Sequence, residues 1–296
     1  MRVMDCTARI SATPDAAPYP GPVRLVTWNV NSIRTRVDRV LAFLDRSQAD
    51  VLAIQETKCR DDQFPTAAFE AAGYEVAHFG LSQWNGVAIA SRVGLDDVAT
   101  RFPGQPGFAK TLAGDSPDAL LAVDPPIEAR AIGATCGGVR VWSLYVPHGR
   151  ALDDPHYTYK LAWLDALRTA AQTWADAGDP VALTGDWNVI PFDTDVYDPA
   201  AFVGRTHVSP PERAAFHAFA DAGYTELTRQ FLPAEHLYTY WDYQQLAFPR
   251  NKGLRIDFCW ASPALAPRAT GAVIDRDERK GKGASDHVPV IVDLAD

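Results

Sequence analysis

An acid and an amide two residues apart follow a short apolar run in the middle of the chain. Residues 180–184 predict a buried strand, and the next four residues are Gly-Asp-Trp-Asn, which include Asp186 and Asn188. A carboxylate and a neutral hydrogen-bonding side chain at a strand end suit the handling of a water molecule beside a phosphate. Gly, Asp and Asn are also favoured in turns for backbone reasons, so this motif alone could be a turn.

Polar motifs end or begin other predicted strands as well. Trp-Asn-Val-Asn ends at residue 31, Gln-Glu-Thr-Lys ends at residue 58, Tyr-Val-Pro-His-Gly begins at residue 145, and Ser-Asp-His begins at residue 285. The side chains that these motifs contribute are Asn29, Asn31, Glu56, Lys58, Tyr145, His148, Asp286 and His287. Several acid-bearing strand ends in one chain favour a shared site over a series of unrelated turns.

Asp257 lies within an otherwise apolar strand predicted over residues 255–261. Strand alternation places Ile256 and Phe258 on one face and Asp257 on the other, together with Arg255. A lone buried carboxylate is costly, so Asp257 needs a partner. Arg255 at the surface is one alternative. His287 is the other, and it is favoured by the acids at the other strand ends, because an Asp–His pair fixes the tautomer and raises the basicity of the imidazole.

The candidate metal ligands are all oxygen donors, namely Glu56 and Asp286 with Asn29 and Asp186 nearby. Hard oxygen ligands without cysteine or clustered histidine select Mg²⁺, or Mn²⁺ as a substitute, over zinc. The four cysteines are scattered without zinc-like spacing, which indicates free thiols in a reducing cytosol. A metal that binds substrate phosphate beside a water-handling carboxylate predicts phosphodiester hydrolysis.

The elements that position these residues are expected to form one folded domain over residues 23–296. Apolar residues make up 47% of the 296-residue chain and charged residues 22%, which is ordinary for a globular protein with a sizeable core. Residues 1–22 hold four prolines without an apolar segment, so we expect a mobile leader rather than a signal peptide. The chain has no run of 18 apolar residues, and we expect a cytoplasmic protein without a membrane span.

Strands and helices alternate without the strict rhythm of a parallel sheet, and Cys-Gly-Gly at 136–138 indicates a hairpin. The predicted strands cover residues 23–30, 50–54, 74–79, 86–90, 129–135, 139–146, 180–184, 237–241, 255–261 and 288–293. The predicted helices cover residues 37–44, 67–72 and 157–177, with another from about residue 211, and residues 101–126 are expected to be a loop. This pattern favours two mixed β-sheets packed face to face and flanked by helices, a four-layer α/β sandwich.

Together with Gly-Val-Ala at 86–88, Tyr-Trp-Asp-Tyr at 240–243 and Gly-Leu-Arg-Ile-Asp at 253–257, the ordered motifs resemble those of the exonuclease III class of AP endonucleases. This class is part of the endonuclease/exonuclease/phosphatase superfamily, which includes DNase I. The resemblance runs from about Val23 to Leu294, and the motifs at 240–243 and 253–257 are the more specific to DNA repair. It implies a DNase I-like fold and a Mg²⁺-dependent nuclease that cleaves 5′ to abasic sites and processes 3′ ends.

The resemblance also implies roles for the residues around the metal and the attacking water. Glu56 would be the main metal ligand, with Asp286 and Asn29 completing or supporting the site. Asp186 would orient and deprotonate the attacking water. Asn188 would hold that water or a phosphate oxygen.

A further set of roles that the resemblance implies concerns the phosphate and the DNA. Asp257 would orient His287, which would stabilise charge on the scissile phosphate, and Tyr145 would contact the phosphate or assist the leaving oxygen. Trp241 looks like the wall of an apolar pocket for an extruded abasic sugar, although it could be a plain core aromatic. The candidate contacts with DNA are Arg130, Arg250, Lys252, Asn31, Lys58 and His148.

Two departures from the family pattern have consequences for activity. The family usually carries Asn or Gln where this chain has His148, and a histidine titrates near neutrality, so we expect DNA binding to become more pH-sensitive. Residues 83–85 are Gln-Trp-Asn, where relatives more often place a lysine and an aromatic. This second change is expected to alter the balance among activities without removing the chemistry.

The net charge of −9 argues against general electrostatic attraction to nucleic acid but permits a local basic face. The expected partner is double-stranded DNA with abasic sites or blocked 3′ ends, bound by a monomer. The alternatives are an enzyme that acts mainly as a 3′–5′ exonuclease, a lipid phosphodiesterase of the same fold, and a non-catalytic binder of damaged DNA. Basic residues between 250 and 255 and the absence of a membrane-facing amphipathic segment favour DNA over lipid, and the intact set of carboxylates favours an enzyme.

Overall fold

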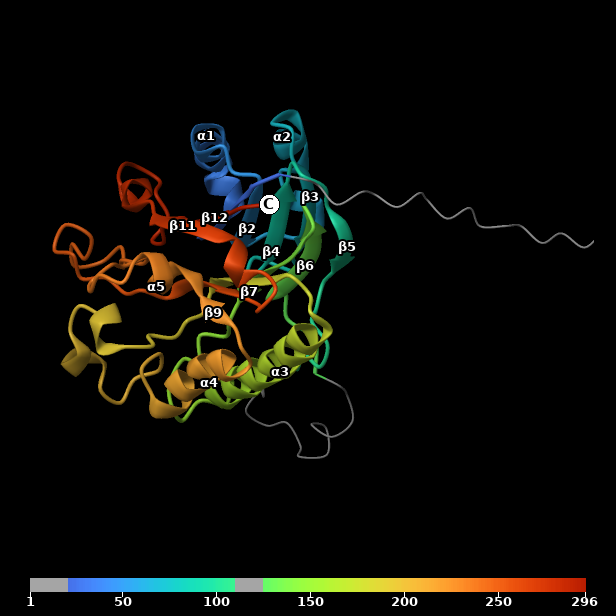
Figure 1. The fold of residues 1–296 in the computed structure, drawn as a ribbon. Helices are drawn as coiled ribbons and strands as arrows, with labels where there is room; N and C mark the ends of the chain where they lie inside the picture. The colour runs from blue at the N-terminus through green and yellow to red at the C-terminus, as the bar shows by residue number, and fades with distance from the viewer. Residues whose placement is uncertain (1–20, 110–124) are drawn as a thin grey trace, which may run out of the picture.

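The computed structural model describes residues 21–109 and 125–296, so the leader expected over residues 1–22 lies outside it except for its last two residues. Two mixed sheets pack face to face in the middle of the fold (Figure 1). The outer layers are α1 (Val37–Ser47) and α2 (Thr66–Ala71) on one side and α3 (Pro155–Ala177) and α4 (Pro210–Asp221) on the other. The predicted four-layer sandwich is therefore confirmed.

The first sheet contains six strands from both ends of the chain. They are β1 (Val23–Asn29), β2 (Val51–Gln55), β3 (Glu75–Phe79), β4 (Val87–Ser91), β11 (Ala269–Ile274) and β12 (Val290–Leu294). The strand order is β11-β12-β1-β2-β4-β3. Only β1 and β2 pair in parallel, while the other neighbours are antiparallel.

The second sheet is built from the middle of the chain and, like the first, has six strands with one parallel pair. Its strands are β5 (Asp96–Ala99), β6 (Ala131–Cys136), β7 (Val139–Tyr145), β8 (Val181–Asp186), β9 (Thr225–Glu226) and β10 (Asp257–Ala261). The order is β5-β6-β7-β8-β10-β9, and β7 and β8 form the parallel pair. The short helix α5 (Leu227–Phe231) follows β9 directly.

The predicted strand over residues 237–241 does not form. Tyr240 instead forms two isolated β-bridges, one to Leu254 and one to His287. Because these bridges go to two different segments, they do not extend into a continuous ladder of strand hydrogen bonds. The strand predicted over residues 180–184 is longer than expected, because β8 continues through Gly185 and Asp186. A side chain at Gly185 would place its Cβ 1.9 Å from the Leu144 carbonyl oxygen, so glycine permits the close approach of β7 and β8.

Three apolar layers stabilise the sandwich. One lies between the sheets and includes Leu25, Ile89 and Val141, while the others lie beneath α1 and α2 and beneath α3 and α4. The three cysteines in the described ranges are buried and free, as the sequence predicts for them. Within residues 21–109 and 125–296, helices with the length and apolar character of a membrane span are absent.

The two outer helices of the second sheet begin at clear sequence signals. Asp154 caps α3 by accepting a hydrogen bond from the backbone N–H of His156 at 2.8 Å, and Gly178 ends the helix in the left-handed region at φ 76°. Ser209 caps α4 and shares a capping box with Glu212. These caps fix where each helix starts over the sheet.

A fully buried ion pair joins α3 to α4. Lys160 Nζ donates to Glu212 Oε1 at 2.5 Å and to the carbonyl oxygen of Asn188 at 2.6 Å. Glu212 Oε1 also accepts hydrogen bonds from Thr206 Oγ1 and from the backbone N–H of His207. The charges are thus compensated by hydrogen bonds, and they tie the loops after β8 to the helical layer.

We predict that Lys160→Met destabilises the protein by about 3 to 5 kcal/mol, because it leaves the buried Glu212 carboxylate without its cation. Denaturant unfolding measures this difference. Arg168→Met on the same helix is the control, since Arg168 lies 3.8 Å from Asp165 near the surface and its loss should change stability by less than about 0.5 kcal/mol. Equal effects of the two substitutions would contradict the assigned role of the buried pair.

Candidate active site

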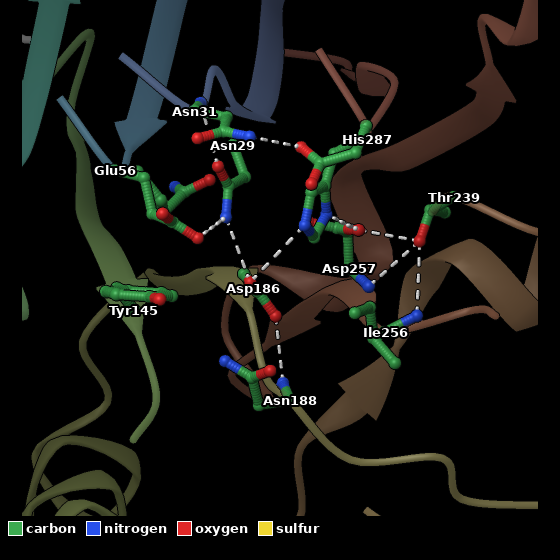
Figure 2. Close-up of polar contacts among 12 residues, drawn as sticks. Asn29, Asn31, Glu56, Tyr145, Asp186, Asn188, Thr239, Ile256, Asp257 and His287 are labelled. Carbon is green, nitrogen blue, oxygen red and sulfur yellow. Dashed lines mark hydrogen bonds and ion pairs between the residues drawn. The ribbon is translucent and has the colours of Figure 1, made fainter. Parts of the chain in front are cut away.

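The carboxyl ends of the two parallel strand pairs meet at one edge of the sandwich (Figure 2). β1 and β2 end with Asn29 opposite Gln55, and β7 and β8 end with Tyr145 opposite Asp186. Glu56 follows β2 directly. Asn29 Nδ2 donates to Glu56 Oε1 at 2.9 Å and to Asp186 Oδ2 at 3.0 Å, so a single amide links the two sheets.

An Asp–His pair lies on the other side of Asp186. β10 places Asp257 directly opposite Asp186 in the antiparallel register. His287 Nδ1 donates to Asp257 Oδ2 at 2.9 Å, and Thr239 Oγ1 donates to the same oxygen at 2.6 Å. Arg255, the alternative partner, instead donates to groups in and just after α5. Asp257 therefore pairs with the imidazole rather than with the guanidinium.

Burial and neighbouring charges shift the pKa values of the central residues. Burial raises the pKa of Asp186 to about 7, and the carboxylates of Asp257 and Glu56 act in the same direction against the opposing charge of His287. Burial acts to lower the pKa of His287, but Asp257 and Asp186 outweigh it and raise this pKa to about 10. Burial also raises the pKa of Tyr145 well above its usual value. Near neutral pH, His287 is therefore a cation, Tyr145 keeps its proton and can donate a hydrogen bond, and Asp186 can exchange a proton.

Glu56 is ionised despite its partial burial. Burial acts to raise its pKa, but the charge of Lys58 and the hydrogen bond from Asn29 outweigh burial and lower the pKa below its ordinary value. Lys58 Nζ lies 2.6 Å from Glu56 Oε2. Asn29 presents its amide nitrogen to the carboxylates, while its Oδ1 accepts from the backbone N–H of Asn31 at 3.0 Å, so Asn29 supports the acids from behind.

A group of potential metal ligands lies at the centre of the site. Ligand atoms of Glu56, Asp186 and His287 all lie within 4.8 Å of one another. Asp286 faces the same cavity, and its Oδ1 accepts a hydrogen bond from Asn31 Nδ2 at 3.0 Å. Carboxylate oxygens dominate this donor set, which fits a hard divalent cation such as Mg²⁺ or Mn²⁺.

The backbone N–H of Asn188 fixes the second oxygen of Asp186, donating to Asp186 Oδ1 at 2.9 Å. Its side-chain amide is also fully engaged, because Nδ2 donates to the Val146 carbonyl oxygen at 2.9 Å and Oδ1 lies 3.0 Å from His207 Nε2. Asn188 therefore orients Asp186 in this arrangement. Both residues, with Tyr145, line a cavity of about 690 Å³.

Comparison with known proteins identifies this arrangement. The family model described as Endonuclease/Exonuclease/phosphatase family matches residues 26–287. The chain belongs to this family. Exodeoxyribonuclease III of Haemophilus influenzae is 27% identical over 276 residues, which cover 90% of this chain and 98% of that protein.

Two solved structures extend the similarity. A 3′ phosphatase from Neisseria, bound to a product DNA hairpin, is 34% identical with a TM-score of 0.82, covering 92% of this chain and 99% of that one. An AP endonuclease from Archaeoglobus fulgidus is 33% identical with a TM-score of 0.81, covering 93% of this chain and 99% of that one. Within the family, the chain is accordingly a hydrolytic DNA repair nuclease of the exonuclease III class.

The residues predicted to contact DNA divide into two groups in the structure. Asn31, Lys58, His148 and Lys252 line the cavity, whereas Arg130, Arg250 and Trp241 are not among its lining residues. Arg130 is 4% exposed. Its Nε donates to Glu128 Oε2 at 2.6 Å, and its guanidinium lies 4.9 Å from the centroid of the Tyr145 ring. The structure thus buries this cation beneath Tyr145, which argues against the predicted DNA contact at Arg130.

Trp241 is a core residue rather than a pocket wall, contrary to prediction. It is 1% exposed and packs edge-on against Phe248 and Tyr238. Its Nε1 donates to Asn251 Oδ1 at 3.3 Å, so the indole is also held from its polar side. Apolar and aromatic surface in the cavity comes instead from Tyr197, Phe202, Tyr240, Ala247, Leu254 and Ile256.

His148 lines the cavity as a neutral imidazole. Its Nδ1 accepts a hydrogen bond from the backbone N–H of Arg150 at 3.0 Å, which leaves Nε2 to carry the proton. Desolvation by the cavity wall, followed by the charge of Lys160, lowers its pKa to about 4, although the residue keeps an exposed face. This low pKa argues against titration near neutrality, and in its neutral form the ring offers an N–H donor as an amide would.

Sequence reasoning missed several residues that shape the site. Thr239 holds Asp257, and the Tyr240 ring lies 4.9 Å from the His287 ring. Both belong to the Thr-Tyr-Trp-Asp-Tyr run at 239–243, in which no sequence pattern distinguishes the side chains that face the site. His207 lies 19 residues beyond Asn188 in a polar loop, and the sequence carries no spacing signal for their contact.

We predict that His148→Asn leaves the pH dependence of DNA binding unchanged between about pH 6 and 8. The lowered pKa means that the wild-type imidazole gains a proton only as the pH falls towards 4, well below this range. Fluorescence anisotropy with a duplex carrying an abasic-site analogue measures the dissociation constant, in EDTA to prevent cleavage. His148→Ala is the control and should weaken binding several-fold at each pH by removing the donor. Binding that tightens on acidification only in the wild type would contradict a neutral His148.

Proposed function

We propose that this chain is a divalent-metal-dependent nuclease that cleaves duplex DNA 5′ to abasic sites and processes blocked 3′ ends. The observation that carries the proposal is the convergence of Glu56, Asp186 and His287 within one cavity. An ionised acid can hold a divalent cation, a proton-exchanging acid can accept a proton from water, and a cationic imidazole can stabilise charge on a phosphate. Membership of the exonuclease III class supports DNA as the substrate.

In this mechanism, Asp186 accepts the proton of the attacking water. Asn29 and the Asn188 backbone hold its two oxygens and so fix the direction of its remaining lone pairs. His287 donates from Nε2 to a phosphate oxygen, because its Nδ1 is engaged by Asp257. A cation in this place stabilises the charge that develops on the phosphate and costs no reorganisation when the reaction occurs.

Tyr145 lies at the end of β7 beside these groups and lines the same cavity. Its phenol keeps its proton at neutral pH because burial raises its pKa. In the proposed reaction it donates a hydrogen bond to the phosphate or to the leaving oxygen. Arg130 packs against the ring from behind and holds it in place.

Glu56 and Asp286 would hold the divalent cation, Mg²⁺ or in its place Mn²⁺. The cation, when bound, supplies neutralisation of the phosphate charge. Lys58 and Asn31 connect the two acids, since Lys58 contacts Glu56 and Asn31 donates to Asp286. These contacts keep both carboxylates directed towards the cavity.

Recognition of the lesion is assigned to the cavity wall. An abasic nucleotide is cheap to extrude and small enough to enter a recess lined by Tyr240, Leu254 and Ile256. Lys252 at the rim would contact the DNA backbone, and such contacts position DNA without reading its sequence.

We propose a cytoplasmic monomer that acts on the nucleoid.

A second candidate function is processing of 3′ ends as the main activity. It is favoured by the 34% identity to a 3′ phosphatase that is bound to a product DNA hairpin. The same carboxylates and imidazole would serve both reactions. The two functions differ in the DNA that enters the cavity.

We predict that the protein cuts a duplex with one abasic-site analogue directly 5′ to the lesion in Mg²⁺ and not in EDTA. Asp186→Asn should lower the rate by roughly 10²- to 10⁴-fold, because the variant lacks the proton acceptor. Labelled strands resolved on a denaturing gel measure both the position and the rate of cleavage.

Asp165→Asn, at an exposed site on α3, is the matched control and should cleave as the wild type does. An undamaged duplex and a 3′-phosphate duplex complete the set. Removal of the 3′ phosphate without a cut at the lesion would establish the second candidate. No Mg²⁺-dependent product from any duplex would contradict the nuclease assignment.

A further inference from the structure

Glu56 lies in a turn with two left-handed residues. The φ angle is 53° at Glu56 and 52° at Lys58. Residues with a Cβ rarely adopt this conformation, and it persists where the surrounding structure enforces it. Because Glu56 is the principal ligand in the proposed metal site, the groups that hold this turn decide where its carboxylate lies.

The backbone of the turn is hydrogen-bonded on both sides. Residues 56–58 bond to residues 32–33 on one side and to residues 85–86 on the other, with N···O distances from 2.7 to 3.1 Å. The remaining polar group of the turn that points away from the cavity is the hydroxyl of Thr57. This side chain is fully buried.

The Thr57 hydroxyl begins a chain of three polar side chains. Thr57 Oγ1 lies 2.8 Å from His78 Nε2, and His78 Nδ1 makes a close but poorly aligned contact of 2.9 Å with Asp61 Oδ1. Burial lowers the pKa of His78 to about 4, so the ring is neutral at physiological pH. The carboxylate favours the proton on Nδ1, and Nε2 therefore accepts the hydrogen bond that Thr57 donates.

Asp61, His78 and Thr57 follow one another as the acid, imidazole and hydroxyl of an activated nucleophile do. The Thr57 hydroxyl, however, is not accessible to a substrate. A Cβ at Gly86 would lie 2.1 Å from Thr57 Oγ1, so the Gly86 backbone covers the hydroxyl directly. The ring of His78 is covered as well, being 6% exposed and packed 4.5 Å from the ring of Phe64. The chain of contacts can act only on the position of the turn.

We propose that Asp61, His78 and Thr57 are positioning residues that hold the Glu56 turn and so set the affinity of the site for a divalent cation. The inference rests on the proposed metal-dependent nuclease function. His78 lies on β3, the edge strand of the first sheet, and Asp61 begins the short 3₁₀ helix Asp61–Gln63. These three side chains therefore connect the turn that carries Glu56 to two elements outside the cavity, β3 and the 3₁₀ helix.

The test is the affinity of the full chain for Mn²⁺ without DNA, measured from the electron paramagnetic resonance signal of the free ion. Thr57→Val keeps the volume of the side chain and removes its hydroxyl, and it should weaken Mn²⁺ binding by roughly tenfold or more. Thr57→Ser keeps the hydroxyl and should bind within about twofold of the wild type. His78→Phe keeps the packing against Phe64 and should weaken binding as Thr57→Val does.

Two further variants separate positioning from general stability. Thr57→Val combined with His78→Phe should bind no more weakly than either single variant, because both remove the same hydrogen bond. Leu167→Ala, in the core beneath α3, should lower the unfolding temperature without changing Mn²⁺ affinity. Asp61 is 62% exposed, so Asp61→Asn should have a smaller effect than the other substitutions.

Wild-type affinity in Thr57→Val, with or without a lower unfolding temperature, would overturn the positioning role. Equal loss of affinity in Leu167→Ala would overturn it too, since affinity would then follow stability alone. Glu56→Gln distinguishes failure of the underlying function. If it binds Mn²⁺ as tightly as the wild type, then the metal site itself is wrongly placed.

Discussion

Two buried carboxylates, those of Asp186 and Asp257, occupy directly paired positions on neighbouring strands of one sheet. Two acids this close in a dry environment require a cation between them. His287 supplies it, with Nδ1 2.9 Å from Asp257 and Nε2 3.8 Å from Asp186. His287 comes from the segment before β12, a strand of the first sheet, whereas Asp186 and Asp257 belong to the second sheet. The ion pairs of His287 with these acids therefore also fix how the two sheets meet at the site. Removing the imidazole would leave two acids competing for one proton.

The topology explains why so many groups converge there. Each sheet has one parallel pair among its described strands, β1 with β2 and β7 with β8, and parallel strands end at the same edge. The apolar layer between the sheets gives way near this edge to polar contacts. Gln55 Nε2 donates to Ser143 Oγ at 3.0 Å across the interface, and Ser143 Oγ donates to the Ile54 carbonyl oxygen at 2.9 Å. These directional bonds set the sheets at one spacing, which apolar packing alone specifies less sharply.

The sequence predicted the groups whose roles follow from period and charge. Strand alternation put Asp257 on the face away from Phe258, and the cost of burying it pointed to His287, as the structure has it. The sequence-based prediction was wrong where it had to decide which of two adjacent residues faces the cavity. Trp241 is buried while Tyr240 lines the cavity, and no local pattern distinguishes them because their segment forms bridges rather than a strand. Arg130, the residue before β6, is another such case, since its position in the sequence gives no sign that an aromatic ring covers it.

Backbone conformation is the part of the site that a single sequence conceals most completely. Asn31, Glu56, Lys58 and Asn188 all have φ between 44° and 53°, and each follows a strand that ends at the site. Asparagine tolerates this region, but Glu56 and Lys58 have no such preference, so their conformation is imposed by contacts from distant segments. A regular strand would direct alternate side chains to opposite faces, whereas a left-handed residue at the strand end turns the chain and redirects the next side chain. Left-handed residues at the strand ends thus allow strands whose side chains pack in the core to direct several polar groups into one cavity. The position of these polar groups therefore depends on contacts that hold the strained backbone in place.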